Sequence, residues 1–334
     1  EVEITILAEE PRLAYDRVHL TEYFSGKSAK DLTLCRADFA DAYGIDLRLN
    51  TKATDIDTCN KCITTNHGDV ISYDKLVLAT GSYAFVPPIS GHDRNNCFVY
   101  RTIDDLDAIR AASLSAKSGV VIGGGLLGLE AAKALRDLDL ETHVVEFAPR
   151  LMAVQIDDLG GKVLRAKIEN LGVKVHTQKA TSAIEDGVNS THVMKFADGS
   201  ELETDIILFS AGIRPRDELA RQSGLALGER GGIVINDYCQ TSDADIYAIG
   251  ECALWNNRIY GLVAPGYDMA RIAAKHVMQQ SCPTFAGADM STKLKLMGVD
   301  VASVGDAHAM TANALSYFYA DEDAMVYKKI VVNA

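Results

Sequence analysis

The sequence predicts an α/β protein that contains two copies of one strand–helix–strand unit, followed by the start of a third domain. Two observations support this prediction. Between Ser118 and Phe147 a strand, a glycine-rich turn, a helix and a second strand follow one another. Spaced matches then relate the first part of the chain to the end of this unit and to the residues beyond it. Helical and strand patterns that alternate in this way are typical of parallel sheets.

The turn in this unit carries three glycines at a spacing that has a chemical meaning. Val120–Ile122 is an apolar run, as in a buried parallel strand, and Gly123, Gly125 and Gly128 follow it. The first glycine allows a tight turn, the second lets the backbone approach a pyrophosphate, and the third lets helix and strand pack closely. The pyrophosphate would bind the free N–H groups at the helix N-terminus. The unit therefore predicts a Rossmann-like dinucleotide site.

The acid that ends the second strand predicts which dinucleotide binds. Strand 143–145 ends at Glu146, 18 residues after Gly128. A carboxylate there accepts hydrogen bonds from a ribose 2′-hydroxyl and repels the 2′-phosphate of NADP, so we expect NAD(H). A glycine-rich turn that serves packing alone is the alternative. The intervening helix supports the nucleotide site, because it has an apolar face of Leu129, Ala132 and Leu135.

The repeat lies in two pairs of matching segments. Strand 4–7, Glu9 and a Pro-Arg-Leu run correspond to strand 143–145, Glu146 and a second Pro-Arg-Leu run. Further on, 68–81 and 199–212 share a turn, an aspartate and an apolar strand that ends in glycine, at identical spacing. Because residue 1 already lies in the second strand of the first copy, we expect roughly 25 to 30 further residues before it in the natural protein. A degenerate first copy is the alternative.

Composition limits the partners and the compartment. The net charge of −13 over 334 residues disfavours nucleic acid and anionic membranes, which both attract basic surfaces. No apolar run reaches the ~18 residues of a membrane span. The seven cysteines are scattered and odd in number, unlike a disulfide framework, and Cys59 and Cys62 have no second CxxC pair with which to bind a metal. We expect a cytoplasmic protein without a metal site.

The remaining elements follow from hydrophobic periodicity and from glycine stops. A hairpin surrounds Cys59–Cys62, and the segment after Arg150 predicts a helix with Leu159, Val163 and Ile168 inward. The expected helices are 31–43, 102–112, 151–170 and 267–279, and the second of these rests on the apolar pattern of Ile103, Leu106 and Ile109. The expected strands include 45–49, several within 173–209, 233–236, 243–251 and the alternating tail from 293.

Four motifs together carry a family resemblance. They are Ala79-Thr80-Gly81, the loop 123–128, SAGIRP at 210–215 and IYAIGE at 246–251. This set resembles the FAD- and NAD(P)H-dependent reductases of the rubredoxin and ferredoxin reductase type. More closely, runs such as AYDRVHLTEYFSG (14–26), GGGLLGLEAA (123–132) and the stretch 230–258 are similar to the flavoprotein front part of NADH-dependent nitrite reductase large subunits. The resemblance covers essentially the whole chain.

The resemblance implies two interleaved Rossmann-like dinucleotide-binding domains, for FAD and NAD, plus the start of a C-terminal α+β interface domain. The expected boundaries are 1–104 with 237–284 for FAD, 105–236 for NAD and 285–334 for the partial third domain. The implied function is a diaphorase that passes electrons from NADH through FAD toward iron–sulfur and sirohaem centres of a longer nitrite reductase. A free-standing NADH-dependent rubredoxin or ferredoxin reductase is one alternative, and an NAD-binding module that has lost FAD is another. A homodimer is left open.

The resemblance also implies roles for individual residues. Glu9 corresponds to the acid at the FAD ribose, Thr80 and Gly81 approach its pyrophosphate, and Glu251 replaces the usual aspartate at the ribityl chain. Glu130 lies where the family places an acid near nicotinamide and flavin. We expect it to position rather than donate a proton, because Glu22 occupies the place of its lysine partner. The expected cofactor-binding residues are Glu9, Arg17, Ala79, Thr80, Gly81, Gly123, Gly125, Leu127, Gly128, Glu146, Gly212, Gly250, Glu251, Ala264, Pro265 and Lys295.

Overall fold

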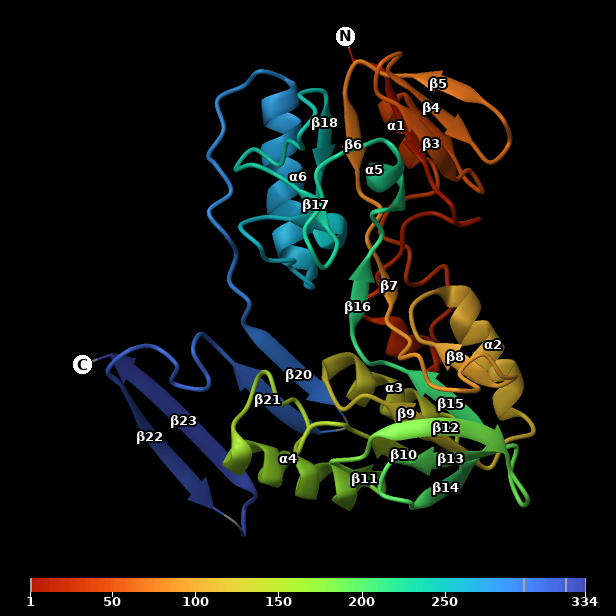
Figure 1. Cartoon of the computed structure of the whole chain (residues 1–334), viewed down its shortest axis with the longest axis vertical. Helices are drawn as coiled ribbons and strands as arrows, with labels where there is room; N and C mark the ends of the chain where they lie inside the picture. Colours follow the sequence, from red (N-terminus) through yellow and green to blue (C-terminus); the bar gives the residue numbers. More distant parts are fainter. Residues whose placement is uncertain (1, 297, 322, 334) are drawn as a thin grey trace. The chain divides into compact units, whose positions relative to one another are not determined.

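The computed structural model describes residues 2–296, 298–321 and 323–333. The chain divides into two compact units, each assembled from segments that lie far apart in the sequence (Figure 1). Unit 1 comprises Glu1–Val18, Ala29–Tyr83 and Ile213–Asp289, and unit 2 comprises His19–Ser28, Ala84–Gly212 and Met290–Ala334. The interleaved arrangement implied by the resemblance is therefore confirmed.

These units do not coincide with the expected cofactor domains. Residues 213–236 belong to unit 1, although we expected them in the NAD domain, and residues 290–334 belong to unit 2. The units are defined by packing, whereas the expected boundaries describe which segments bind each cofactor. Those boundaries remain a prediction.

Unit 2 is built on a five-stranded parallel sheet with the order β11-β10-β9-β15-β8. This is the Rossmann-like arrangement that the glycine loop predicted, with the loop strand in the middle. The strands are β8 (Cys97–Val99), β9 (Ser118–Ile122), β10 (Glu141–Val145), β11 (Lys174–His176) and β15 (Ile206–Phe209), and the helices are η1 (Leu20–Tyr23), α2 (Ile103–Ser113), α3 (Leu126–Asp137) and α4 (Asp158–Asn170).

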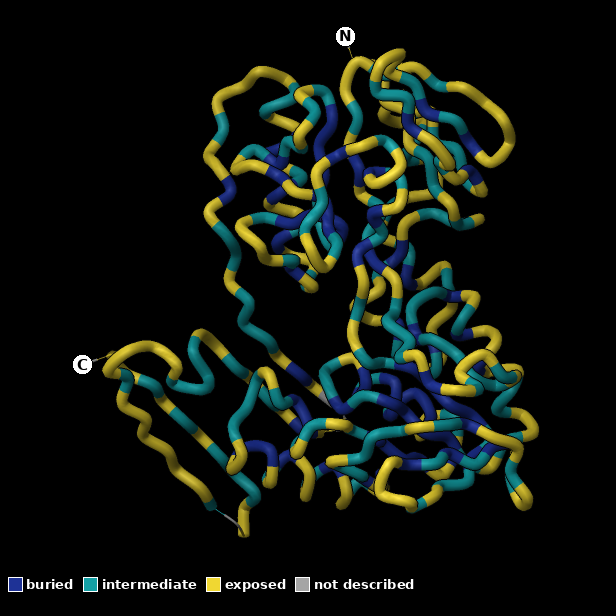
Figure 2. The backbone as a smooth tube through the Cα atoms, viewed as in Figure 1, coloured by how far each residue is buried: buried dark blue, intermediate teal, exposed yellow. Residues whose placement is uncertain are grey.

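The core of unit 2 lies between this sheet and an antiparallel three-stranded sheet. The second sheet consists of β12 (Thr181–Asp186), β13 (His192–Phe196) and β14 (Glu201–Thr204). Figure 2 shows the buried backbone concentrated in the central strands. Apolar side chains from both sheets form one cluster with Ile89 of the loop before β8: Val120, Ile122, Val145, Ile184, Met194, Phe196, Ile207 and Phe209. Burial of such side chains is the main stabilising term in a fold of this type.

Helix α2 begins at a complete capping box. The Thr102 side chain accepts a hydrogen bond from the amide of Asp105, and the Asp105 carboxylate accepts one from the amide of Thr102. The helix then buries Ile103, Leu106 and Ile109. These are the three inward positions that the sequence pattern predicted, so this prediction is confirmed.

Unit 1 consists of smaller sheets and contains one long helix. Two parallel pairs, β1 with β2 and β6 with β18, carry the segments that matched in the sequence repeat. The strands are β1 (Ile4–Leu7), β2 (Ile45–Arg48), β3 (Ala53–Asp57), β4 (Cys62–Thr65), β5 (Val70–Ser72), β6 (Leu76–Leu78), β7 (Ser82–Ala84), β16 (Ile213–Pro215), β17 (Ile233–Val234), β18 (Ile246–Ala248) and β19 (Ala253–Leu254), and the helices are α1 (Phe39–Tyr43), α5 (Glu218–Gln222), η2 (Gly250–Cys252) and α6 (Val263–Val277).

The tail adds two antiparallel strand pairs to unit 2. They are β20 (Thr292–Leu296) with β21 (Val299–Ser303), and β22 (Ala314–Asp321) with β23 (Val326–Asn333). Strand β20 lies against α3, and β23 lies against α4. The strand alternation expected from residue 293 onward is therefore confirmed for the described residues.

The helix expected over 31–43 is wrong except for its last turn, α1. The amide of Asp16 donates to Leu32 O, and the amide of Leu34 donates to Ala14 O. These backbone groups thus pair across to another segment and do not form i→i+4 bonds. The predicted stop is correct, because Gly44 adopts a left-handed conformation with φ of 63°.

Helix α4 begins later than we expected. Asp157 caps it by accepting a hydrogen bond from the amide of Gly160, so residues 151–157 form a loop instead of a first turn. The inward residues shift accordingly. Leu164 and Ile168 are buried, whereas Leu159 is 39% exposed.

None of the helices in the described part of the chain has the length and apolar composition that a membrane span requires.

Asp205, the aspartate of the second repeat copy, joins three segments of unit 2, and its removal tests that role. Its carboxylate accepts hydrogen bonds from the amides of Lys117, Ser118 and Thr191. Burial raises the pKa of Asp205, but these donors lower it more, so its stabilising effect is lost only as the pH falls below its ordinary range. We expect Asp205→Ala to reduce the free energy of unfolding by about 3 kcal/mol in urea titration at pH 7.

The control is the corresponding aspartate of the first copy. Asp74 is exposed, so Asp74→Ala should change the free energy of unfolding by less than about 0.5 kcal/mol. Equal losses in the two variants would contradict the role given to Asp205.

Candidate dinucleotide-binding sites

The glycine loop of unit 2 has the geometry that the spacing predicted. Gly123 has φ of 122°, and a Cβ atom there would lie 2.2 Å from Ser210 O. A Cβ atom on Gly128 would lie 1.9 Å from Gly123 O, so only glycine lets α3 approach the end of β9. Gly125 is different, because a Cβ atom there would meet nothing within 4 Å. Open space thus lies before the N-terminus of α3, where an anion would bind.

Glu146 is held at this loop by backbone donors. The Gly124 amide donates to Glu146 Oε2 at 2.5 Å, and the Ala148 amide donates to Oε1 at 2.7 Å. A Cβ atom on Gly124 would lie 2.6 Å from Leu151 Cδ2 and 3.0 Å from Glu146 Oε2. Sequence reasoning missed Gly124, although the run of three consecutive glycines was a signal. The loop and the acid therefore form one rigid arrangement.

Two more predicted residues lie at the same edge of the sheet. Gly212, with φ of 108°, follows β15, and its carbonyl accepts a hydrogen bond from the amide of Phe85. Leu127 lies in the first turn of α3 and is 45% exposed. Because β9, β10 and β15 are parallel, the residues after them share the carboxyl edge, where ligands bind in such sheets.

Glu130 lies one turn further along α3. Burial raises its pKa from the ordinary value of 4.5 to about 7, and the electrostatic interaction with His19 offsets only part of this. No hydrogen bond to its carboxyl group is found in the described part of the chain. Tyr100 lies nearby and donates to Thr21 Oγ1 at 3.2 Å. Glu22, in the place of the absent lysine, pairs with Lys27.

The predicted residues of unit 1 gather at the end of the β6–β18 pair. These strands align in register from Leu76 opposite Ile246 to Leu78 opposite Ala248. Ala79-Thr80-Gly81 and Gly250-Glu251 therefore follow neighbouring strand ends. Ser82 Oγ donates to Glu251 Oε2 at 2.7 Å, which fixes the longer carboxylate that stands in place of aspartate.

Glu9 lies between two basic side chains. Its carboxylate is 3.0 Å from Lys52 Nζ and 2.6 Å from Arg216 Nη2. Burial raises the pKa of Glu9, but these cations lower it more, so the net shift is below the ordinary value. The Arg216 carbonyl also accepts a hydrogen bond from Thr80 Oγ1 at 2.6 Å. Arg216 thus links two predicted site residues, and no sequence pattern indicated it.

The N-terminus of α6 is the remaining feature of this edge. Leu262 precedes the helix without a side-chain cap, so the first-turn amides of Val263 and Ala264 have no side-chain acceptor at the cap. Pro265 is buried in the first turn. Gly250 has φ of 74°, and a Cβ atom on Gly266 would lie 3.4 Å from Gly250 Cα.

Two predicted residues lie apart from these groups. Arg17 pairs with Glu10, and its guanidinium lies 4.6 Å from the centre of the Tyr15 ring. Lys295 belongs to unit 2, where its backbone pairs with Asp300 across the β20–β21 hairpin. Neither contact requires a cofactor.

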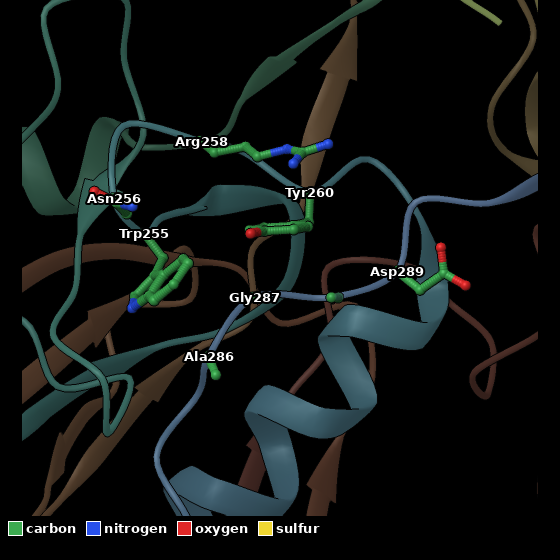
Figure 3. Close-up of a pocket in the computed structure, with 8 residues that line it drawn as sticks. Trp255, Asn256, Arg258, Tyr260, Ala286, Gly287 and Asp289 are labelled. Carbon is green, nitrogen blue, oxygen red and sulfur yellow. The ribbon is translucent and has the colours of Figure 1, made fainter. Parts of the chain in front are cut away.

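Unit 1 also has an open hollow of about 560 Å³ that contains none of the predicted residues (Figure 3). Trp255 and Tyr260 form its aromatic wall, and both rings pack edge-on against the buried Phe285. Arg258 lies over the Tyr260 ring at 5.1 Å. These contacts form an aromatic cluster next to residues 286–289.

The fold, with its two candidate sites at strand edges, is that of the flavin- and pyridine-nucleotide-dependent proteins with two interleaved Rossmann-like domains. The model of the pyridine nucleotide-disulphide oxidoreductase family matches residues 1–281, and the chain belongs to this family, which binds FAD and NADH.

Three comparisons show how far the similarity extends. The chain is 56% identical over 332 residues to the nitrite reductase (NADH) large subunit of Escherichia coli (strain K12), with 99% of this chain and 39% of that protein covered. It is 31% identical to the rubredoxin-NAD(+) reductase of Alcanivorax borkumensis, with 82% and 72% covered. An NAD-dependent persulfide reductase from A. fulgidus superposes with a TM-score of 0.88 at 26% identity, with 95% and 62% covered. The chain thus spans about two fifths of the first relative.

The raised pKa of Glu130 predicts a specific dependence of stability on pH. Because its pKa in the unfolded chain is near 4.5 and about 7 in the fold, the folded protein loses stability as the pH rises between these values. Glu130→Gln should remove this loss. The free energy of unfolding of the variant, relative to that of the wild type, should therefore rise by up to about 3 kcal/mol from pH 5 to pH 8. Urea unfolding at the two pH values measures this difference.

Glu141→Gln provides the control, because the pKa of this exposed acid is lowered by Lys174 and it stays ionised throughout the range. A gain of the same size in both variants, or in neither, would contradict the assignment to Glu130.

Proposed function

We propose that this chain is the NADH-oxidising FAD module of a nitrite reductase that acts in nitrate assimilation. The observation that carries the proposal is the glycine loop of unit 2, with Glu146 fixed against it by the amide of Gly124. The similarity of the chain to a nitrite reductase (NADH) large subunit, over 99% of its length, supports the assignment to this pathway of nitrite reduction. The electrons would leave toward iron–sulfur and sirohaem centres in a longer protein.

In this proposal unit 2 binds NADH. The open space at Gly125 accommodates a pyrophosphate at the N-terminus of α3, and the Glu146 carboxylate accepts hydrogen bonds from the ribose. Gly123 and Gly128 shape the loop, while Leu127 and Gly212 border it. These residues fit the group, since the space at Gly125 is free of side chains.

Unit 1 would bind FAD. Glu9 accepts hydrogen bonds from the adenosine ribose, Ala79, Thr80 and Gly81 border the pyrophosphate, and Gly250-Glu251 bind the ribityl chain. The uncapped N-terminus of α6, at Ala264 and Pro265, favours negative charge beside it. These residues fit FAD because they follow the neighbouring ends of β6 and β18 and because Ser82 fixes the Glu251 carboxylate. Arg17 completes the proposed set in unit 1, and the role of Lys295 stays a prediction from the resemblance.

The mechanism assigns orientation and electrostatics to the protein. FAD held by the unit 1 residues would supply the redox chemistry, namely hydride acceptance from the nicotinamide and release of single electrons. Glu146 selects the dinucleotide and fixes its ribose, while Glu130 positions the nicotinamide end. Because Glu130 has a pKa of about 7, its carboxyl group is largely protonated below neutral pH and then places no negative charge beside the site.

Two alternatives have support of their own. The similarity to a rubredoxin-NAD(+) reductase favours a free-standing reductase for a small iron–sulfur carrier. The ion pairs of Glu9 with Lys52 and Arg216 favour an NAD-binding module without FAD, because the hydroxyl groups of a ribose would compete with these two residues for the carboxylate. We further propose that the protein acts in the cytoplasm.

A visible absorption spectrum of the purified protein tests the proposal directly. We expect a flavin band that bleaches on anaerobic addition of NADH and responds weakly to NADPH. A band that NADH does not bleach would contradict hydride transfer. A colourless protein that binds NADH would support the module without FAD.

Glu146 should control the choice between NADH and NADPH. Because one charged hydrogen bond contributes about 1.5–3 kcal/mol, Glu146→Ala should raise the KM for NADH about tenfold or more. The ratio of kcat/KM for NADH to kcat/KM for NADPH should therefore fall. Steady-state reduction of ferricyanide by both cofactors measures the ratio. Glu141→Ala, at the other end of β10, should leave the ratio unchanged.

A further inference from the structure

The tail of unit 2 is fastened to the N-terminus of α4 at one carboxylate. The tail comprises residues 290–296, 298–321 and 323–333. Asp157 Oδ2 accepts hydrogen bonds from Tyr327 Oη at 2.6 Å and from Lys329 Nζ at 3.0 Å. Its other oxygen caps α4 through the amide of Gly160 at 3.1 Å. The charge of Asp157 is thus shared between the helix and the C-terminal hairpin.

The packing around this carboxylate is tight at Gly160. A Cβ atom on Gly160 would lie 3.1 Å from Tyr327 Cδ1, so the tyrosine ring lies directly over the first turn of α4. Lys329 Nζ also donates to Ala307 O at 3.0 Å, which ties a second tail segment to the same point.

The tail also bonds to the backbone of the preceding loop. This loop, residues 147–157, connects Glu146 to α4. Ser303 Oγ donates to Gln155 O at 2.7 Å, and His308 Nε2 lies 3.0 Å from Val154 O. Three separate places in the tail thus contact this loop, at Val154, Gln155 and Asp157.

The same loop, residues 147–157, also contacts the glycine loop at Gly124. The Met152 amide donates to Gly124 O at 2.9 Å, and the buried Leu151 side chain lies against Gly124. Met152 has φ of 47°, a left-handed conformation that a side chain of this size adopts only when its surroundings hold it. Arg150 braces the loop internally, because its Nε donates to Ile156 O at 3.0 Å.

We propose that the tail holds loop 147–157 in the conformation that the dinucleotide site requires, with Asp157 as the positioning residue. The path runs from Lys329 and Tyr327 through Asp157 and Met152 to Gly124, whose amide fixes the Glu146 carboxylate. Weaker attachment of the tail then frees Met152 and Gly124, and the adenosine end of the site loses its order. The inference rests on the proposed NADH site, although the order of the loop itself does not.

A double variant, Tyr327→Phe with Lys329→Met, tests this in the full chain. It removes two donors to Asp157 and leaves the Gly160 cap intact. We expect the KM for NADH to rise about three- to tenfold with kcat unchanged, since neutral and charged hydrogen bonds of this kind are worth factors of that order. Amide hydrogen exchange in 150–157 and at Gly124 should accelerate, while exchange in β9 and β15 should not.

The matched control is Tyr319→Phe with Lys328→Met on the same hairpin. Tyr319 donates to Asp321, within the hairpin itself, and its cross-strand partner is Lys328. This variant should leave both the KM and the exchange pattern as in the wild type. If the first double variant does not fold, His308→Ala removes one loop contact and should accelerate exchange at 152–155.

The outcomes separate the two proposals. Unchanged exchange in 150–157, or equal changes in test and control variants, would overturn the role of the tail. A wild-type protein that does not oxidise NADH would overturn the proposed function, whereas faster exchange in the test variant alone would still support the positioning role of Asp157.

Discussion

Helix α3 can lie against β9 only because no side chain separates Gly128 from the carbonyl oxygen of Gly123, where a Cβ atom would be 1.9 Å away. Much of unit 2 depends on this approach. It directs the N-terminal amides of α3 toward the carboxyl edge of the sheet and leaves the space at Gly125 open. It also places Gly124 where its amide donates a hydrogen bond to the Glu146 carboxylate and its carbonyl accepts one from the Met152 amide. A substitution at Gly128 would displace the loop, the acid and the supporting segment together.

Features that depend on local spacing could be predicted from the sequence. The glycine loop, the inward face of α2 and the strand ends after Leu78 and Ala248 all follow from patterns a few residues long. The helix expected over 31–43 failed, because the backbone of Leu32 and Leu34 bonds to a distant segment, which no local periodicity reveals.

For the candidate site, too, residues at a fixed local spacing could be predicted, whereas residues that contact it from distant segments could not. Glu146 could be found because it ends a strand at a fixed distance from Gly128, whereas Arg216 could not. Arg216 reaches Glu9 across 207 positions of sequence, and Tyr327 reaches Asp157 across 170. Pairing at such separations is decided by the packing of the whole unit, so one sequence supplies no signal for it. The residues that hold a site in place are therefore harder to predict than those that form it.

The two copies of the repeat place an acid at the same point but treat its charge differently. Glu9 is neutralised by Lys52 and Arg216, while Glu146 is held by uncharged backbone amides. Neutral donors orient a carboxylate and leave its negative charge in place, so Glu146 retains the field that repels a 2′-phosphate. Glu9, with two cations beside it, has no such field. In the proposed NADH site, discrimination between NADH and NADPH by charge would therefore depend on unit 2 and not on unit 1, although the sequence pattern around the two acids is nearly the same.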